Sequence, residues 1–139
     1  MTIQIVGALL VVTLWTTSSF AQEAEVAASG KAEFQQYCAL CHGLNGKGDG
    51  AMKNLNLLAE NPPDLTQLSK QHGGKFPFWQ VYRIIDGREP VKGHGGTPNM
   101  PIWGDLFSMQ TKEGGLDSET KTTGRILNIV YYLQSLQEK

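Results

Sequence analysis

The chain has 139 residues, of which 18% are charged, and its formal net charge is −1. That length is typical of a single domain. The near-neutral charge excludes a basic nucleic-acid-binding surface and a highly charged disordered chain, so we expect no nucleic-acid partner. Residues 22–139 contain 15 of the 16 glycines and all six prolines, which predicts few long elements and a thin core that packing alone does not hold together.

The first 21 residues have the pattern of an export signal. An apolar run over residues 3–15 is followed by a polar stretch and by small residues at Ser19 and Ala21, which predicts a secretory signal peptide cleaved after Ala21. The run is shorter than the roughly 20 apolar residues of a membrane span. No Lys or Arg precedes it, so an uncleaved anchor stays as an alternative. In both cases we expect the remainder in the periplasm, with membrane contact only through an uncleaved N-terminal segment.

The exported part is predicted to be a helical domain over residues 30–139, preceded by a disordered lead at residues 22–29. Apolar spacing predicts a helix over residues 31–40 and a turn or two over residues 51–59. A middle helix is predicted over residues 78–86, between Pro77 and Gly87. Residues 88–104 are predicted to be a loop. A last helix, capped by Ser118, is predicted to run to about Gln137.

The apolar stripe of the last helix is formed by Ile126, Ile129, Val130, Leu133 and Leu136. No segment shows the sustained alternation of a strand. The predicted fold class is therefore all-α, with long glycine- and proline-rich loops.

Both cysteines of the chain lie in one short motif, Cys38-Ala39-Leu40-Cys41, and His42 follows directly. Residues three apart share a face of a helix, so the two thiols can form thioethers with the two vinyl groups of one haem. The next residue then presents its imidazole to the iron. This is the attachment motif of c-type haem, and it predicts covalent attachment at Cys38 and Cys41 with His42 as an axial ligand of the iron.

Other uses of two cysteines three residues apart were compared with haem attachment. A disulfide between the two cysteines would suit an oxidising compartment. A thioredoxin-like redox pair has the same spacing but occurs in a βαβ unit, which the sequence lacks. Zinc needs four ligands, which His72 and His94 could complete. The export signal favours haem, because covalent attachment takes place outside the cytoplasm.

The second axial ligand is predicted to be Met100, which lies between Pro98 and Pro101 in a loop stiffened by prolines. A methionine ligand raises the potential of a haem iron. Met52 is only ten residues beyond His42, which is too near to reach the opposite haem face. The alternatives are Met109, a histidine (His94 or His72), or an open site.

On these motifs the exported part resembles the class I c-type cytochromes, especially the small bacterial ones, over nearly all of residues 30–137. The positions that match the family besides the attachment motif are Gly30, Phe34, Met100, Pro101, Tyr132 and Leu133. The resemblance implies a cytochrome c fold of three to five short helices around one covalent haem c and its iron. It also implies that the two terminal helices cross where Gly30 meets Tyr132.

Two features depart from the family pattern. The proline that orients the proximal imidazole usually lies closer to the motif than Pro62 or Pro63, so the segment of residues 43–61 must loop out. Residues that contact the haem propionates are not matched. The candidates for that role, which are equally suited to an ordinary core, are Trp79, Tyr82, Arg83 and Trp103.

The expected function is electron transfer by a periplasmic monohaem cytochrome whose iron cycles between Fe(II) and Fe(III). With His42 and Met100 both bound, the iron has no position for a substrate, so we expect a carrier and not an enzyme. Its partners are expected to be redox proteins that bind transiently. The alternatives are a cytochrome subunit of a membrane oxidase or dehydrogenase, and a haem enzyme or gas sensor with an open axial site.

Overall fold

The computed structural model describes residues 16–58, 60–88, 100–111 and 114–138. Over these residues it contains seven α-helices, one 3-10 helix and no strand, which confirms the predicted all-α class. Three of the helices are single turns: α2 (Ala39–His42), α3 (Ala51–Asn54) and α4 (Leu68–Gln71). The 3-10 helix η1 (Leu65–Gln67) leads directly into α4. None of the helices in this part of the chain is long and apolar enough to cross a membrane.

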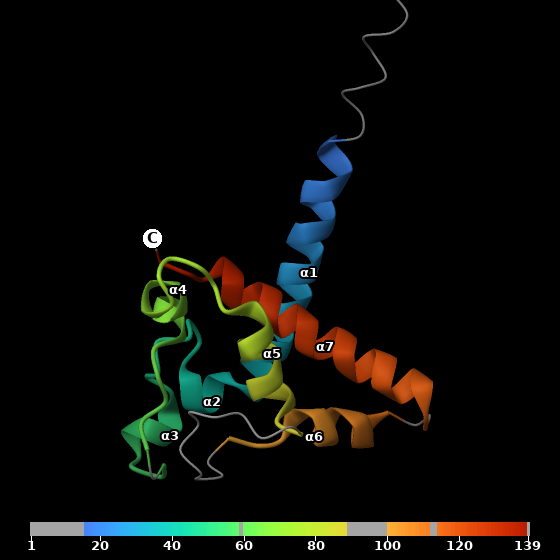
Figure 1. The fold of residues 1–139 in the computed structure, drawn as a ribbon. Coiled ribbons are helices and arrows are strands. Elements are labelled where there is room, and N and C mark those ends of the chain that lie inside the picture. The colour runs from blue at the N-terminus through green and yellow to red at the C-terminus, as the bar shows by residue number, and fades with distance from the viewer. Residues whose placement is uncertain (1–15, 59, 89–99, 112–113, 139) are drawn as a thin grey trace, which may run out of the picture.

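Two long helices, α1 (Thr16–Tyr37) and α7 (Leu116–Ser135), cross and form the frame of the domain. Figure 1 shows α1 rising past α7, so that its first turns extend beyond the other helices. A side chain at Gly30 would overlap the backbone carbonyl of Asn128 and would lie 2.9 Å from the Cβ atom of Tyr132. The predicted close approach of Gly30 and Tyr132 is therefore confirmed.

The other side of α7 packs against α5 (Phe78–Asp86) and α6 (Trp103–Gln110). The core that the four longer helices share consists of Phe34, Cys38, Val81, Ile85, Phe107, Ile126, Ile129, Val130, Tyr132 and Leu133. The predicted stripe of the last helix is thus buried, and Leu136 lies partly buried beside it. The ring centroids of Phe34 and Tyr132 lie 5.4 Å apart, so the two rings pack against each other near the Gly30 crossing.

The bounds of α5 coincide with the predicted middle helix. Gly87 ends it in the left-handed region, with φ 70°, and donates its N–H to the carbonyl of Arg83. Only a residue without a Cβ atom adopts that conformation at little cost.

Three expectations differ from the structure. Residues 22–29 belong to α1 and are not a disordered lead, because their alanines and glutamates favour a helix even without an apolar stripe. The predicted loop over residues 88–104 ends earlier, because α6 begins at Trp103. The last helix begins at Leu116 after Gly115, and Ser118 is not its cap. Ser118 is buried instead, and its hydroxyl lies 3.1 Å from that of Ser108 on α6.

Candidate functional site

The attachment motif lies at the junction of α1 and α2. Cys38 closes α1 by donating its N–H to the carbonyl of Phe34, and its own carbonyl accepts from the N–H of His42 at 2.9 Å. Cys38 is buried and Cys41 is partly buried, and both are free thiols. Cys38, at the start of α2, and Cys41 and His42 within it thus place two thiols and one imidazole within about one turn, as the sequence predicts.

The glycine-rich segment after His42 folds back against this junction. Gly48 has φ 71°, and its N–H donates to the carbonyl of His42 at 2.8 Å. A side chain at this position would collide with the backbone carbonyl of Pro62. Residues 43–48 thus form a tight turn that brings Gly48 against the Pro62–Pro63 segment, and both of these prolines line the cavity described next.

A cavity of about 220 Å³ lies between α1, α2, α5 and α7. Cys38, Cys41, His42 and Met100 all line it. Its apolar walls include Phe34, Leu65, Val81, Ile85, Ile129 and Leu133. The structure therefore brings Met100, which lies 58 residues beyond His42 in the chain, to the same cavity as the attachment motif.

None of the other candidate ligands that the structure describes lines this cavity. Met109 is 78% exposed on α6, and Met52 does not line the cavity. His72 is exposed, and its ring nitrogen Nδ1 lies 2.8 Å from the carbonyl of Leu68. His94 lies outside the residues that the structure describes. Of the methionines that the structure describes, Met100 lines the cavity together with the attachment motif.

The electrostatics of the cysteines argue against a thiolate site. Burial raises the pKa of Cys38 to about 12, and the nearby Glu33 and Cys41 contribute to the rise. A cysteine that is redox-active without a metal needs a lowered pKa, because the thiolate is the reactive form. Across the described segments, no three His, Cys, Asp or Glu side chains gather as a metal site. A neutral thioether fits the buried, apolar position of Cys38 without the cost of burying a charge.

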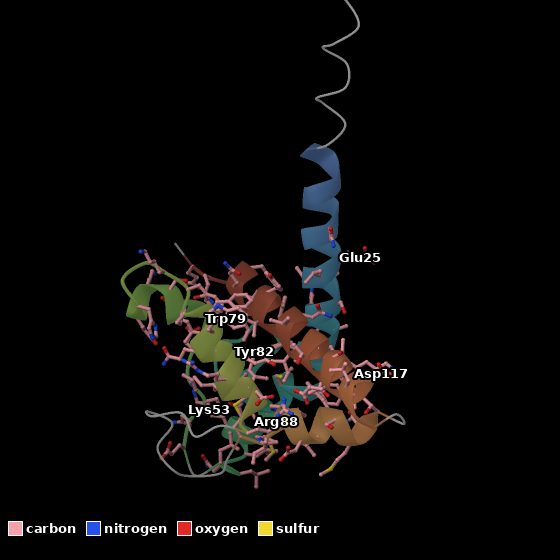
Figure 2. All side chains as sticks on the ribbon, turned by 45° about the vertical axis from the view of Figure 1, so that its right-hand side comes forward. Glu25, Lys53, Trp79, Tyr82, Arg88 and Asp117 are labelled. Carbon is pink, nitrogen blue, oxygen red and sulfur yellow. The ribbon has the colours of Figure 1, made fainter. Side chains whose placement is uncertain are left out.

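Of the aromatic candidates for haem contact, Trp103 lines the cavity. Its ring packs on Tyr37 of α1 at 5.5 Å and on Phe107 at 5.3 Å. Trp79 and Tyr82 lie along α5 in Figure 2, and Trp79 is 65% exposed. Neither these two nor Arg83 is among the described residues of the lining. Tyr37, which also lines the cavity, was missed by sequence reasoning, although it stands one residue before the motif.

Comparison with known families agrees with this geometry. The family model described as Cytochrome c matches residues 27–137. The chain belongs to the cytochrome c family. The match covers the whole domain from the Gly30 crossing to the end of α7, and it identifies a monohaem class I cytochrome c. Neither a curated protein nor a solved structure matches the chain.

Membership of this family implies a covalently attached haem c and electron transfer as the general activity. The residues present fit such a group. Two free thiols stand at the edge of one apolar cavity, and an imidazole and a thioether sulfur also line it. A haem in this cavity would supply the apolar core that the composition of this cytochrome lacks. This explains how a chain so rich in glycine and proline can form a core.

Proposed function

We propose that this cytochrome is a periplasmic electron carrier in which His42 and Met100 are the axial ligands of one haem iron. The observation that carries the proposal is that the attachment motif and Met100 line the same apolar cavity. When bound, the haem would supply one-electron Fe(II)/Fe(III) chemistry. A closed ligand set leaves no position for a substrate, so the protein acts as a carrier and not as an enzyme.

The residues of the chain have separate tasks in this proposal. Cys38 and Cys41 would hold the group covalently, and His42 and Met100 would bind its iron. The apolar walls limit water and favour the iron state of lower charge, and the thioether ligand acts in the same direction. Because both ligands stay in place, little reorganisation accompanies each electron.

Redox partners are proposed to dock transiently over α2 and α3. These two short helices pack against each other, and four leucines in and after them are at least 60% exposed: Leu40, Leu44, Leu55 and Leu57. This exposed apolar surface lies beside Cys41, next to the cavity that the haem would occupy. A net charge of −1 supports little long-range steering, so we expect weak complexes of small contact area.

Location in the periplasm is proposed from the apolar run of residues 3–15 and the small residues at Ser19 and Ala21. The intact mass of the protein isolated from the periplasm tests this. A mass that lacks residues 1–21 and includes one haem supports export with cleavage. Retention of these residues in a membrane fraction would favour an anchored subunit of an oxidase or dehydrogenase complex.

The ligand set is tested by comparing Met100→Ala with Met109→Ala. Met109 is a matched control, because it is a methionine that is 78% exposed. We expect the wild type and Met109→Ala to show the long-wavelength Met–Fe(III) charge-transfer band and to bind carbon monoxide poorly when reduced. Met100→Ala should lose the band and bind carbon monoxide readily. An unchanged spectrum in Met100→Ala would exclude Met100, and an open site in the wild type would instead favour an enzyme or a gas sensor.

A further inference from the structure

The segment that carries Met100 leaves the end of α5 and returns to the start of α6, and its two ends are packed against each other. At Gly87, a Cβ atom would lie 3.2 Å from the Cα atom of Ile102. At Gly104, a Cβ atom would lie 2.5 Å from Nε of Arg88 and 2.5 Å from Oδ1 of Asp86. Residues 86–88 and 102–104 therefore lie side by side, and we call these six residues the neck of the Met100 segment.

Arg88 joins the neck to α7. Its guanidinium donates to Asp86, with Nη2 2.6 Å from Oδ1, and to Glu119, with Nη1 2.8 Å from Oε2 and Nη2 2.7 Å from Oε1. The Asp86 side chain is only 10% exposed, whereas that of Glu119 is 48% exposed. Figure 2 shows Arg88 at the end of α5, beside the start of α6. One side chain thus ties the end of α5 to the first turns of α7.

The position of Met100 depends on this neck. Met100 lies two residues before Ile102, which contacts Gly87, and it packs partly buried against the core. An open neck would release Ile102 and, with it, Met100 two residues before, so that the sulfur would lose its fixed position. Removal of Arg88 also leaves the buried carboxylate of Asp86 without its partner, which is strongly unfavourable and would push the neck apart.

We propose that Arg88 is the positioning residue for Met100: its double ion pair with Asp86 and Glu119 holds the neck closed and thereby keeps the thioether on the iron. The proposal rests on the His42/Met100 ligation proposed above. It assigns Arg88 no contact with the haem. Arg88 affects how often the sulfur leaves the iron. Loss of Arg88 should therefore change the rate of ligand exchange, which a general loss of stability would not do.

Cyanide is the probe, because it binds ferric iron only while Met100 is off, so that its rate of binding reports the fraction of protein in that state. We expect Arg88→Gln to bind cyanide about tenfold faster than wild type, because the sulfur leaves the iron more often when the neck is open. A tenfold change corresponds to about 1.4 kcal/mol. Its Met–Fe(III) band should weaken in parallel. Arg88→Lys keeps the charge but not the two-pronged pairing, and should lie between the two.

Arg125→Gln is the matched control. Arg125 also pairs with a carboxylate, with Nη2 2.8 Å from Oε2 of Glu33, and its guanidinium stacks on Phe107 at 3.8 Å, but it joins α7 to α1 and α6 away from the neck. Its hydrogen-bond partners, Glu33 and Gln110, are outside the six neck residues. This variant should lose stability and bind cyanide at the wild-type rate. Equal acceleration in the Arg88 and Arg125 variants would overturn the proposal, as would a wild-type rate in Arg88→Gln.

A second pair of variants tests the neck without removing a charge and serves also if Arg88→Gln does not fold. Gly104→Ala places a methyl group against Arg88 and Asp86, whereas Gly124→Ala on α7 meets open space. Gly104→Ala should accelerate cyanide binding and Gly124→Ala should not. Equal rates in the two variants would refute the role of the neck in positioning Met100. If wild type lacks the charge-transfer band and Met100→Ala leaves its cyanide rate unchanged, the ligation itself fails. A band that is present but insensitive to Arg88 refutes only the positioning role.

Discussion

Replacement of Gly30 by alanine tests the packing of the two terminal helices, on which the cavity depends. The added methyl group would overlap the carbonyl oxygen of Asn128 and would lie 2.9 Å from the Cβ atom of Tyr132, where ordinary contacts begin at about 3.4 Å. The nearest obstacle is backbone, so a change of rotamer cannot relieve it. The helices must separate, and the contact between Phe34 and Tyr132 must loosen with them.

The magnitude follows from two opposing effects. Overpacking in a well-packed interior costs about 1–3 kcal/mol, while alanine in place of glycine favours a helix by up to about 1 kcal/mol. Because the overlap is with backbone, we take the upper end of the overpacking cost and expect a net loss of about 2 kcal/mol for Gly30→Ala. The matched control is Gly124→Ala on α7, where the methyl group meets nothing within 4 Å. It should gain about 0.5–1 kcal/mol, because only the propensity effect remains.

Thermal unfolding of the haem-loaded protein, followed by far-ultraviolet circular dichroism, measures both variants. For a domain of this size 1 kcal/mol corresponds to roughly 4 °C in Tm. Gly30→Ala should therefore unfold several degrees below wild type and Gly124→Ala slightly above it. If Gly30→Ala unfolds at or above the temperature of Gly124→Ala, the crossing has room for a side chain and our reasoning about it is wrong.

Two further predictions concern stability. A hydrogen bond from Thr66 holds the pKa of Asp64 below its usual value of 3.8, and Arg88 holds that of Glu119 below 4.5. The unfolded chain therefore binds protons first on acidification, and this stabilisation, fully present at neutral pH, should be lost as the pH falls from about 4.5 through the lowered pKa values. Urea unfolding from pH 6 to pH 3 should show it, and Asp64→Asn should flatten the decline; a decline as steep as in the wild type would contradict the assignment. Gln137→Ala should cost about 1–2 kcal/mol in the same assay, because its amide bonds the backbone of residues 65–69, whereas the exposed Gln134→Ala should change little.

The elements that the sequence predicted well are those with local signals at both ends. The bounds of α5 follow from Pro77 before it and Gly87 after it, since each residue acts through its own backbone. The inward stripe of α7 follows from the spacing of Ile126, Ile129 and Leu133. The helix α6 was missed because its inward side chains are Trp103 and Phe107, which pack on Tyr37, a residue more than sixty positions earlier in the chain.

Ser118 illustrates the same limit. A serine before an apolar stripe is a good cap by local rules, but the short link from α6 brings Ser108 to its hydroxyl and buries it. The start of α7 then moves to Leu116, after Gly115. Packing between helices outweighs the local preference here, because a hydroxyl that is buried against a hydrogen-bond partner is no longer available to cap the helix.

By itself, the sequence determined the chemistry of attachment. The spacing of Cys38, Cys41 and His42 is set within one turn of helix, so it can be read without knowledge of any distant contact. Only the tertiary structure shows that Met100, the ligand that the sequence predicts, lines the same cavity as that motif. Met100 is brought to the cavity, and Arg88 closes the neck of its segment, through contacts between residues far apart in the chain, and such contacts leave no periodic pattern for a sequence to display.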